Sequence, residues 1–114
     1  MSDFLPCIPP LRLSALEKNT PQRVKTANGQ AVLVRADDDT LTAFITICPH
    51  AMGDMAYAMV YGGAIECPLH GWRFDQRDGT CLDPVNESPL RTFPTRLIDG
   101  TIEVQISRPK WMDD

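Results

Sequence analysis

The stretch ICPHAMGDMAYAMVYGGAIECPLHGWRFD, residues 47–75, contains both histidines of the chain and two of its four cysteines. The four residues are paired as Cys48-Pro-His50 and Cys67-Pro-Leu-His70. At such spacings two side chains of one tight loop can converge on one metal ion or one edge of a cluster, and the proline stiffens each loop by fixing φ. Since chance pairing of all four is improbable, the stretch predicts a metal centre.

Two kinds of metal centre fit this donor set. Two thiolates and two imidazoles can hold a tetrahedral zinc ion, which would make the chain a zinc-stabilised binding module. The same groups also hold a Rieske [2Fe–2S] centre, with both cysteines on one iron and both histidines on the other. The spacing alone fits both centres, but a zinc protein is colourless whereas the iron–sulfur protein is red-brown, with two irons and two acid-labile sulfides.

Length and charge narrow the class of protein. A chain of 114 residues matches one domain, which we expect to span residues 1–114. The net charge of −4 argues against a nucleic-acid partner. No signal peptide or membrane-spanning apolar run is evident, so we expect a cytoplasmic protein without a membrane partner. Cytoplasmic cysteines are normally reduced, which favours metal ligation over disulfides.

The segments on either side of the metal motif indicate short β-strands. Residues 22–26 and 30–35 flank Asn28-Gly29, a strong hairpin signal, and residues 40–46 predict a third strand. Residues 11–18 have some helical character, enough for a single turn or short helix before Pro21. These features predict antiparallel strands that lead directly to Cys48.

Two more strands follow the motif. Residues 92–98 and 101–106 flank Asp99-Gly100, and residues 101–106 alternate strictly between apolar and polar side chains, which predicts a half-buried strand. Pro94 predicts an edge position or a bulge. Residues 83–89 indicate a loop. The whole pattern predicts an all-β antiparallel domain with metal-binding loops inserted between its early and late strands.

The residues around the ligand pairs resemble a known family. Cys67-Pro-Leu-His-Gly-Trp-Arg-Phe-Asp75 closely resembles the second ligand box of Rieske ferredoxins and of the Rieske domains of ring-hydroxylating oxygenases. Cys48-Pro-His50 resembles the first box, and residues 83–89 look like the family's proline loop. The resemblance covers roughly residues 11–106. It implies a Rieske-type antiparallel β sandwich or incomplete barrel, with an inserted cluster-binding subdomain at about residues 47–90.

The resemblance also implies the cofactor and its ligands. One Rieske [2Fe–2S] cluster per chain is expected, with Cys48 and Cys67 binding the inner iron as thiolates. His50 and His70 are expected to bind the outer iron through neutral imidazole nitrogens. Cys7 and Cys81 lie outside both boxes, and we interpret them as free thiols.

The function implied is electron transfer. A Rieske ferredoxin takes one electron from an NAD(P)H-dependent flavoprotein reductase and passes it to a terminal oxygenase, here of the kind used in aromatic hydrocarbon catabolism. With both histidines committed, none remains for the mononuclear iron of an oxygenase, so we expect no catalysis by this chain alone. A monomer that docks transiently is expected. The alternative is a small Rieske subunit of another redox enzyme, such as a nitrite reductase.

Departures from the family pattern lead to two further expectations. Met52 stands where the family often has glycine, and Met55 is then expected to fill the apolar role beside the cluster. High-potential Rieske proteins carry Cys, Ser and Tyr where this chain has Leu69, Trp72 and Phe74. Without those hydroxyl donors to the sulfurs, we expect a potential at the low end of the family range.

Overall fold

The regular structure of this chain is almost entirely β. The computed structural model describes residues 3–48, 53–69 and 71–107. The strands are β1 (Leu5–Pro6), β2 (Gln22–Thr26), β3 (Gly29–Arg35), β4 (Leu41–Phe44), β5 (Met59–Tyr61), β6 (Ala64–Glu66), β7 (Arg73–Asp75), β8 (Cys81–Asp83), β9 (Thr92–Phe93), β10 (Thr95–Ile98) and β11 (Thr101–Val104). Two short 3₁₀ helices accompany them among the described residues, η1 (Leu13–Ala15) and η2 (Met55–Tyr57). The all-β prediction is therefore confirmed, and the helical character near residues 11–18 amounts to the single turn η1.

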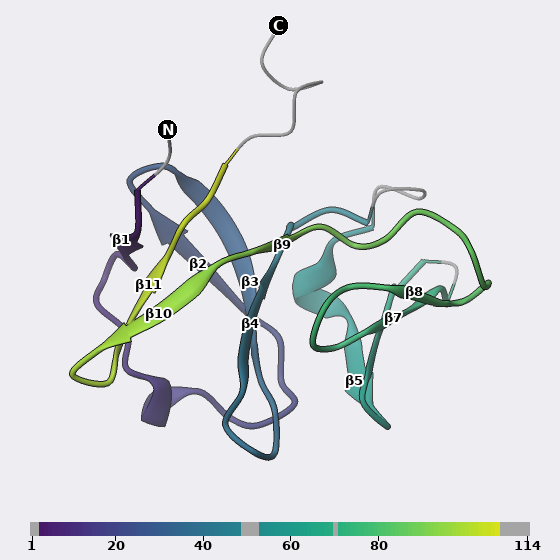
Figure 1. Ribbon diagram of the computed structural model, residues 1–114, viewed down its shortest axis with the longest axis horizontal. Helices are drawn as coiled ribbons and strands as arrows, with labels where there is room; N and C mark the ends of the chain where they lie inside the picture. The colour runs from purple at the N-terminus through teal and green to yellow at the C-terminus, as the bar shows by residue number, and fades with distance from the viewer. Residues whose placement is uncertain (1–2, 49–52, 70, 108–114) are drawn as a thin grey trace, which may run out of the picture.

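The strands form three antiparallel sheets, which Figure 1 shows as two groups. The first sheet has the order β1-β11-β10 and the second β2-β3-β4-β9. The third, β5-β6-β7-β8, lies beside them and is inserted in the chain between β4 and β9. This arrangement puts both predicted ligand loops at the third sheet, as the sequence suggested. Among the described residues, no helix has the length and apolar character to cross a bilayer.

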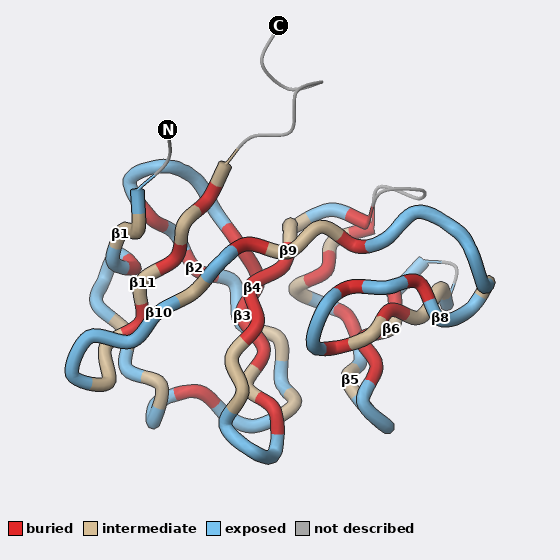
Figure 2. The backbone as a smooth tube through the Cα atoms, in the orientation of Figure 1, coloured by how far each residue is buried: buried red, intermediate tan, exposed pale blue. Residues whose placement is uncertain are grey.

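The second sheet is buried on both faces, as the buried stretches of β3 and β4 show in Figure 2. Ala31 and Leu33 face a core shared with the first sheet. Val32 and Val34 face a second core, shared with the third sheet. Because successive side chains of a strand point to opposite faces, a strand buried on both faces has a continuous apolar sequence. The second sheet therefore packs against the third sheet through the second core, which is separate from the core that it shares with the first sheet.

The third sheet has one apolar face and one polar face. Its strand register aligns the inner residues, which pack in the second core: Val60, Ile65, Phe74 and Cys81. The neighbouring register positions align the outer residues: Met59, Glu66, Arg73 and Asp83. A shift in register between β7 and β8 leaves Leu82 as an extra, exposed residue, as in a β-bulge.

The two predicted hairpins differ in their turns. Asp99 and Gly100 both have positive φ, 51° and 81°, and form the two-residue turn predicted between β10 and β11. The prediction of an Asn28-Gly29 turn is wrong by one residue, because Thr26 pairs with Gly29 and the connection is Ala27-Asn28. The Thr26 hydroxyl accepts a bond from the Asn28 N–H, and the Asn28 side chain donates to the Ile106 carbonyl. These bonds fix Asn28 inside the turn.

Pro94 marks the point where the chain passes from one sheet to another. Thr92–Phe93 pairs with β4 of the second sheet, whereas Thr95–Ile98 pairs with β11 of the first. Proline cannot donate to a ladder, so it suits the position between the two pairings. Its carbonyl still accepts from the Gln105 N–H at 2.9 Å. The expected alternation of residues 101–106 is confirmed, with Ile102, Val104 and Ile106 buried.

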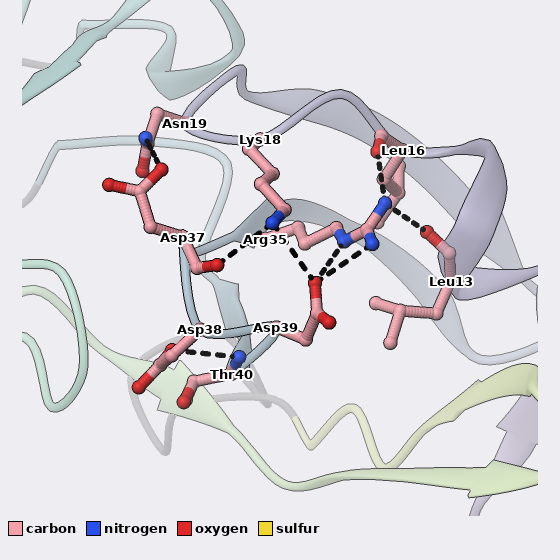
Figure 3. A network of polar contacts seen from close by, with 9 residues as sticks. All are labelled: Leu13, Leu16, Lys18, Asn19, Arg35, Asp37, Asp38, Asp39 and Thr40. Atoms are coloured by element: carbon pink, nitrogen blue, oxygen red, sulfur yellow. Dashed lines mark hydrogen bonds and ion pairs between the residues drawn. The ribbon is translucent and has the colours of Figure 1, made fainter.

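The acidic turn of residues 37–39 is held by a polar network, which Figure 3 shows. The Arg35 guanidinium donates to Asp39 at 2.8 Å and to the Leu16 carbonyl at 3.0 Å. The Asn19 side-chain amide donates to the Asp37 carboxylate at 2.8 Å. The exposed carboxylates of Asp37 and Asp39 are therefore each held by a hydrogen bond from a side chain outside the turn.

A second set of bonds joins the same turn to the third sheet. Arg77 follows β7 and donates to the Asp38 carboxylate at 2.7 Å and to the Thr40 hydroxyl at 3.1 Å. The neighbouring Gln76 donates to Asn19 at 3.1 Å. These hydrogen bonds link the turn after β7 to the residues that lead into the second sheet, in addition to the packing of the hydrophobic core. They therefore help to fix the orientation of the third sheet relative to the second.

We expect Asp38→Asn to lower the melting temperature at neutral pH and to lower it by less at pH 3. The hydrogen bond from Arg77, followed by those from Thr40, holds the pKa of Asp38 well below its usual range. A carboxyl whose pKa is depressed by folding stabilises the fold fully above its unfolded pKa of about 3.9, and that stability declines progressively as the pH falls from there through the folded pKa. The measurement is the difference in melting temperature between the two proteins at pH 6 and at pH 3. A gap of equal size at both values would contradict the role given to this carboxylate.

Candidate metal centre

Cys67 begins the loop that connects β6 to β7. Glu66 and Arg73 form the last residue pair of that hairpin. The Cys67 N–H then donates to the Trp72 carbonyl at 2.7 Å, and the Gly71 N–H donates to the Cys67 carbonyl at 3.1 Å. The second ligand box is therefore a hairpin tip, which we call the second tip (residues 66–73).

Cys48 lies in a loop of the same construction. Ile47 and Asp54 form a bridge, and the Cys48 N–H donates to the Gly53 carbonyl at 2.8 Å. We call this loop the first tip (residues 47–54). In each tip the cysteine N–H bonds the carbonyl five residues further on, directly inside the bridging pair. The described ends of the two tips are thus closed in the same way, in agreement with the likeness of the two boxes in sequence.

The two tips lie against each other. Cys48 and Cys67 are 0% and 1% exposed and belong to the same apolar core, together with Met55. A methyl group placed on Gly53 would lie only 3.1 Å from the Cys67 sulfur and 3.3 Å from Cγ of Leu69. Glycine at position 53 therefore allows the first tip to approach the second. Met55 has the buried apolar position that we expected for it.

The thiol half of the expected ligand set fits a shared metal site. Two buried cysteines from two facing tips, screened from water by one core, are suited to provide the thiolates that an iron–sulfur cluster requires. No disulfide joins the four cysteines of the chain, all of which are described. His50 and His70 lie outside the described residues. Within residues 3–48, 53–69 and 71–107, which exclude both histidines, no three His, Cys, Asp or Glu residues gather as a metal site.

Asp54 anchors the first tip to the second sheet. One of its carboxylate oxygens accepts the Ala56 N–H at 3.0 Å and so caps η2. The other forms an ion pair with Arg23 of β2. One side chain thus ends the tip, begins the helix and connects both to a strand 31 residues earlier.

The second tip is anchored on the outer face of the third sheet. The Tyr61 hydroxyl donates to the Glu66 carboxylate at 2.6 Å, and this hydrogen bond is the main cause that raises the pKa of Tyr61. The Arg73 guanidinium lies over the Tyr61 ring, with Cζ 4.9 Å from the ring centroid. The anchoring residues therefore come from β5, β6 and β7.

None of the three side chains that replace the family's sulfur donors brings a hydroxyl. Leu69 is 60% exposed, Phe74 is fully buried, and Trp72 packs partly buried against the core. Trp72 thus anchors the second tip to the apolar core. Of the two remaining cysteines, Cys7 and Cys81 are both buried, and burial raises the pKa of each thiol. Both are therefore protonated and poorly nucleophilic at neutral pH, in agreement with their interpretation as free thiols.

Sequence reasoning missed the anchoring residues. Neither Arg23 nor Tyr61 was expected to act on a ligand loop. A signal was present, because Asp54 and Arg73 each lie six residues after a ligand cysteine. Superposing the two boxes on Cys48 and Cys67 would have predicted the matching bridge positions, although not their partners on β2 and β5.

Comparison with known proteins agrees with this geometry. The family model described as the Rieske [2Fe-2S] domain matches residues 8–94. The chain belongs to the Rieske [2Fe–2S] domain family. Its cofactor is therefore a Rieske-type [2Fe–2S] cluster, and the zinc alternative is set aside. The match includes both tips and the second and third sheets, whereas the strands of the first sheet lie outside it.

Among curated proteins, this Rieske chain is 32% identical to the anthranilate 1,2-dioxygenase ferredoxin subunit of Burkholderia cepacia, over 82% of the chain and 89% of that protein. Several other curated relatives are longer, and the chain spans only 15% to 27% of their length. The chain thus matches nearly the whole ferredoxin subunit but only part of the longer relatives.

Two solved structures have the same fold. The ferredoxin of carbazole 1,9a-dioxygenase from Nocardioides aromaticivorans IC177 is 28% identical, with a TM-score of 0.72 over 86% of this chain and 98% of that one. A putative NADH-dependent nitrite reductase small subunit from Mycobacterium tuberculosis is 22% identical, with a TM-score of 0.76 over 96% and 99%. The second likeness shows the fold alone, while the first confirms the predicted Rieske ferredoxin fold.

Proposed function

We propose that this Rieske chain is a ferredoxin that carries single electrons from a reductase to a terminal oxygenase. The observation that carries the proposal is its near full-length match to the ferredoxin subunit of a dioxygenase, which it resembles over 89% of that subunit. The carrier has no catalytic role of its own. The second sheet contributes to both hydrophobic cores, which supports residues 1–114 acting as one domain.

Cys48 and Cys67 are the proposed ligands of the inner iron, and His50 and His70 those of the outer iron. The buried position of both cysteines supports the first pair, and the matching positions of the two ligand boxes support the second. When bound, a cluster of this type accepts and releases one electron. The chain holds its thiolates inside the apolar core, which excludes water from that side of the site.

The second tip also reaches the molecular surface. Leu69, between Cys67 and His70, is largely exposed, and Val85 of the loop after β8 is exposed as well. Because a protein partner can approach this end closely, we place electron exchange there. The net charge of −4 favours short-lived docking of a monomer onto a basic surface.

We propose two partners and one compartment. The electron donor is a ferredoxin reductase, an NAD(P)H-dependent flavoprotein, and the acceptor is the terminal oxygenase of a ring-hydroxylating system. The cytoplasm is the proposed location, because four cysteines without a disulfide suit a reducing compartment.

The function is tested by the iron and sulfide content of the purified chain, the EPR spectrum of its reduced form and its transfer of electrons to an oxygenase. The purified chain should contain two irons and two acid-labile sulfides, and its reduced form should give the EPR signal of mixed Cys/His ligation. Reduced chain mixed with an oxidised ring-hydroxylating oxygenase should pass on one electron per cluster. A nitrite reductase that accepts electrons from it while the oxygenase does not would favour the alternative function.

We expect a reduction potential at the low end of the range of roughly −150 to +300 mV for Rieske centres. The physical reason is that Leu69, Trp72 and Phe74 offer no hydroxyl or thiol donor to the cluster sulfurs, so the electron-rich reduced state gains less stabilisation. A redox titration followed by EPR measures it. A midpoint above about +100 mV would contradict the argument.

A further inference from the structure

We propose that the Glu66 carboxylate, held in place by Tyr61 and Arg73, helps to set the reduction potential of the cluster. The inference rests on the proposed function, because it requires a cluster at the two tips. Glu66 directly precedes Cys67 in the chain and occupies the bridging position at the base of the second tip.

Glu66 is fixed on the outer face by contacts that do not neutralise its charge. The Tyr61 hydroxyl donates to it at 2.6 Å, which orients the carboxylate without supplying a counter-charge. Across the ladder Arg73 is its paired residue, yet the guanidinium stacks on the Tyr61 ring. Within the described part of the chain the ion pairs do not include Glu66.

Arg73 acts here as a positioning residue for the tyrosine. Its guanidinium carbon lies 4.9 Å from the ring centroid, and its Nε is buried without a hydrogen-bond partner in the described structure. A cation over the face of a tyrosine is attracted by the ring quadrupole. The stacked pair holds the ring so that its hydroxyl points at Glu66.

The first tip also has a carboxylate in the bridging pair at its base, and this carboxylate and Glu66 differ in their partners. Asp54 occupies the bridging position there, and its charge is compensated by the ion pair with Arg23. Of the two carboxylates at the bases of the tips, only Glu66 lacks an ion pair with another described residue. A negative charge next to a site that accepts an electron disfavours reduction, so Glu66 lowers the potential.

The test compares charge removal at Glu66 with the same change at a distant position. Glu66→Gln keeps the size and removes the charge, whereas Glu17→Gln removes one charge from an exposed residue after η1. For Glu66→Gln we expect an equilibrium constant of reduction about threefold larger, or about 28 mV at 59 mV per tenfold change for one electron. Glu17→Gln should leave the potential within error of the parent. Equal potentials in the parent and both variants would overturn the inference.

A double-mutant cycle tests the part given to Tyr61. Tyr61→Phe keeps the ring under Arg73 and removes the hydroxyl, and Tyr57→Phe is the matched control, since Tyr57 is 76% exposed on η2. In the Tyr61→Phe background, Glu66→Gln should shift the potential less than in the parent. An undiminished shift would show that Tyr61 does not hold the carboxylate.

Iron and sulfide content and the EPR g-values are measured on every variant. If Glu66→Gln fails to load the cluster, Glu66→Met removes the same charge with a side chain of similar size. A parent protein without two irons would defeat the proposed function itself. A loaded parent whose potential does not respond to Glu66 would defeat only this inference.

Discussion

Replacing Cys67 by serine is expected to abolish cluster binding. Cys67 is 1% exposed, lies in the core shared with Cys48 and begins the second tip. A serine hydroxyl remains protonated at neutral pH and cannot replace a thiolate on the inner iron. The iron content per chain should fall below about a tenth of the parent value, with loss of the red-brown absorption, because a metal site needs its full set of deprotonated ligands.

The matched control is Cys81→Ser. Cys81 is a buried thiol of the same core, and its sulfur lies 3.1 Å from the Pro84 carbonyl oxygen, which a serine hydroxyl can also reach as a donor. This variant should keep both irons and change the free energy of unfolding by only about 1 kcal/mol, as ordinary substitutions do. The ligand assignment would be wrong if Cys81→Ser lost the iron while Cys67→Ser retained it.

The second large effect is expected at Gly79. A methyl group on Gly79 would lie 2.0 Å from the Leu90 carbonyl oxygen, and the residue has a φ of +80°. Its carbonyl also accepts from the Leu90 N–H at 2.8 Å, so two backbone segments meet there. Gly79→Ala combines strain at positive φ with a backbone clash, and we expect a loss of about 3 kcal/mol or more in the free energy of unfolding. The shift of the urea midpoint measures it.

Gly63→Ala separates the two causes. Gly63 has almost the same φ, +77°, but no atom lies within 4 Å of the added methyl group. Its cost should be about 1 to 2 kcal/mol, the price of the left-handed backbone alone. Equal urea midpoints for the two variants would show that the contact between Gly79 and Leu90 carries no special weight.

Local signals in the sequence were enough to predict much of the fold. The Asp99-Gly100 turn and the alternation that ends at Ile106 are set by neighbouring residues, so they were correct. The Asn28-Gly29 turn was displaced by one residue because Asn28 bonds Ile106, 78 residues away. The same limit applies to the tips. Spacing was enough to pick out Cys48 and Cys67, which lie buried in one core, but the Arg23 and Tyr61 contacts depend on sheet packing. All four ligands, Cys48, His50, Cys67 and His70, remain a prediction.

The equal construction of the two tips has a consequence for protein design. Ile47 to Asp54 and Glu66 to Arg73 are both eight-residue caps on an antiparallel pair, and each is closed by one cysteine amide. The described part of the site consists of three features: two antiparallel bridges, a glycine where the two tips meet, and an apolar core that contains both cysteine sulfurs. In a designed host we therefore expect two such bridges, meeting at a glycine above an apolar core, to be enough to bring two cysteine thiols together.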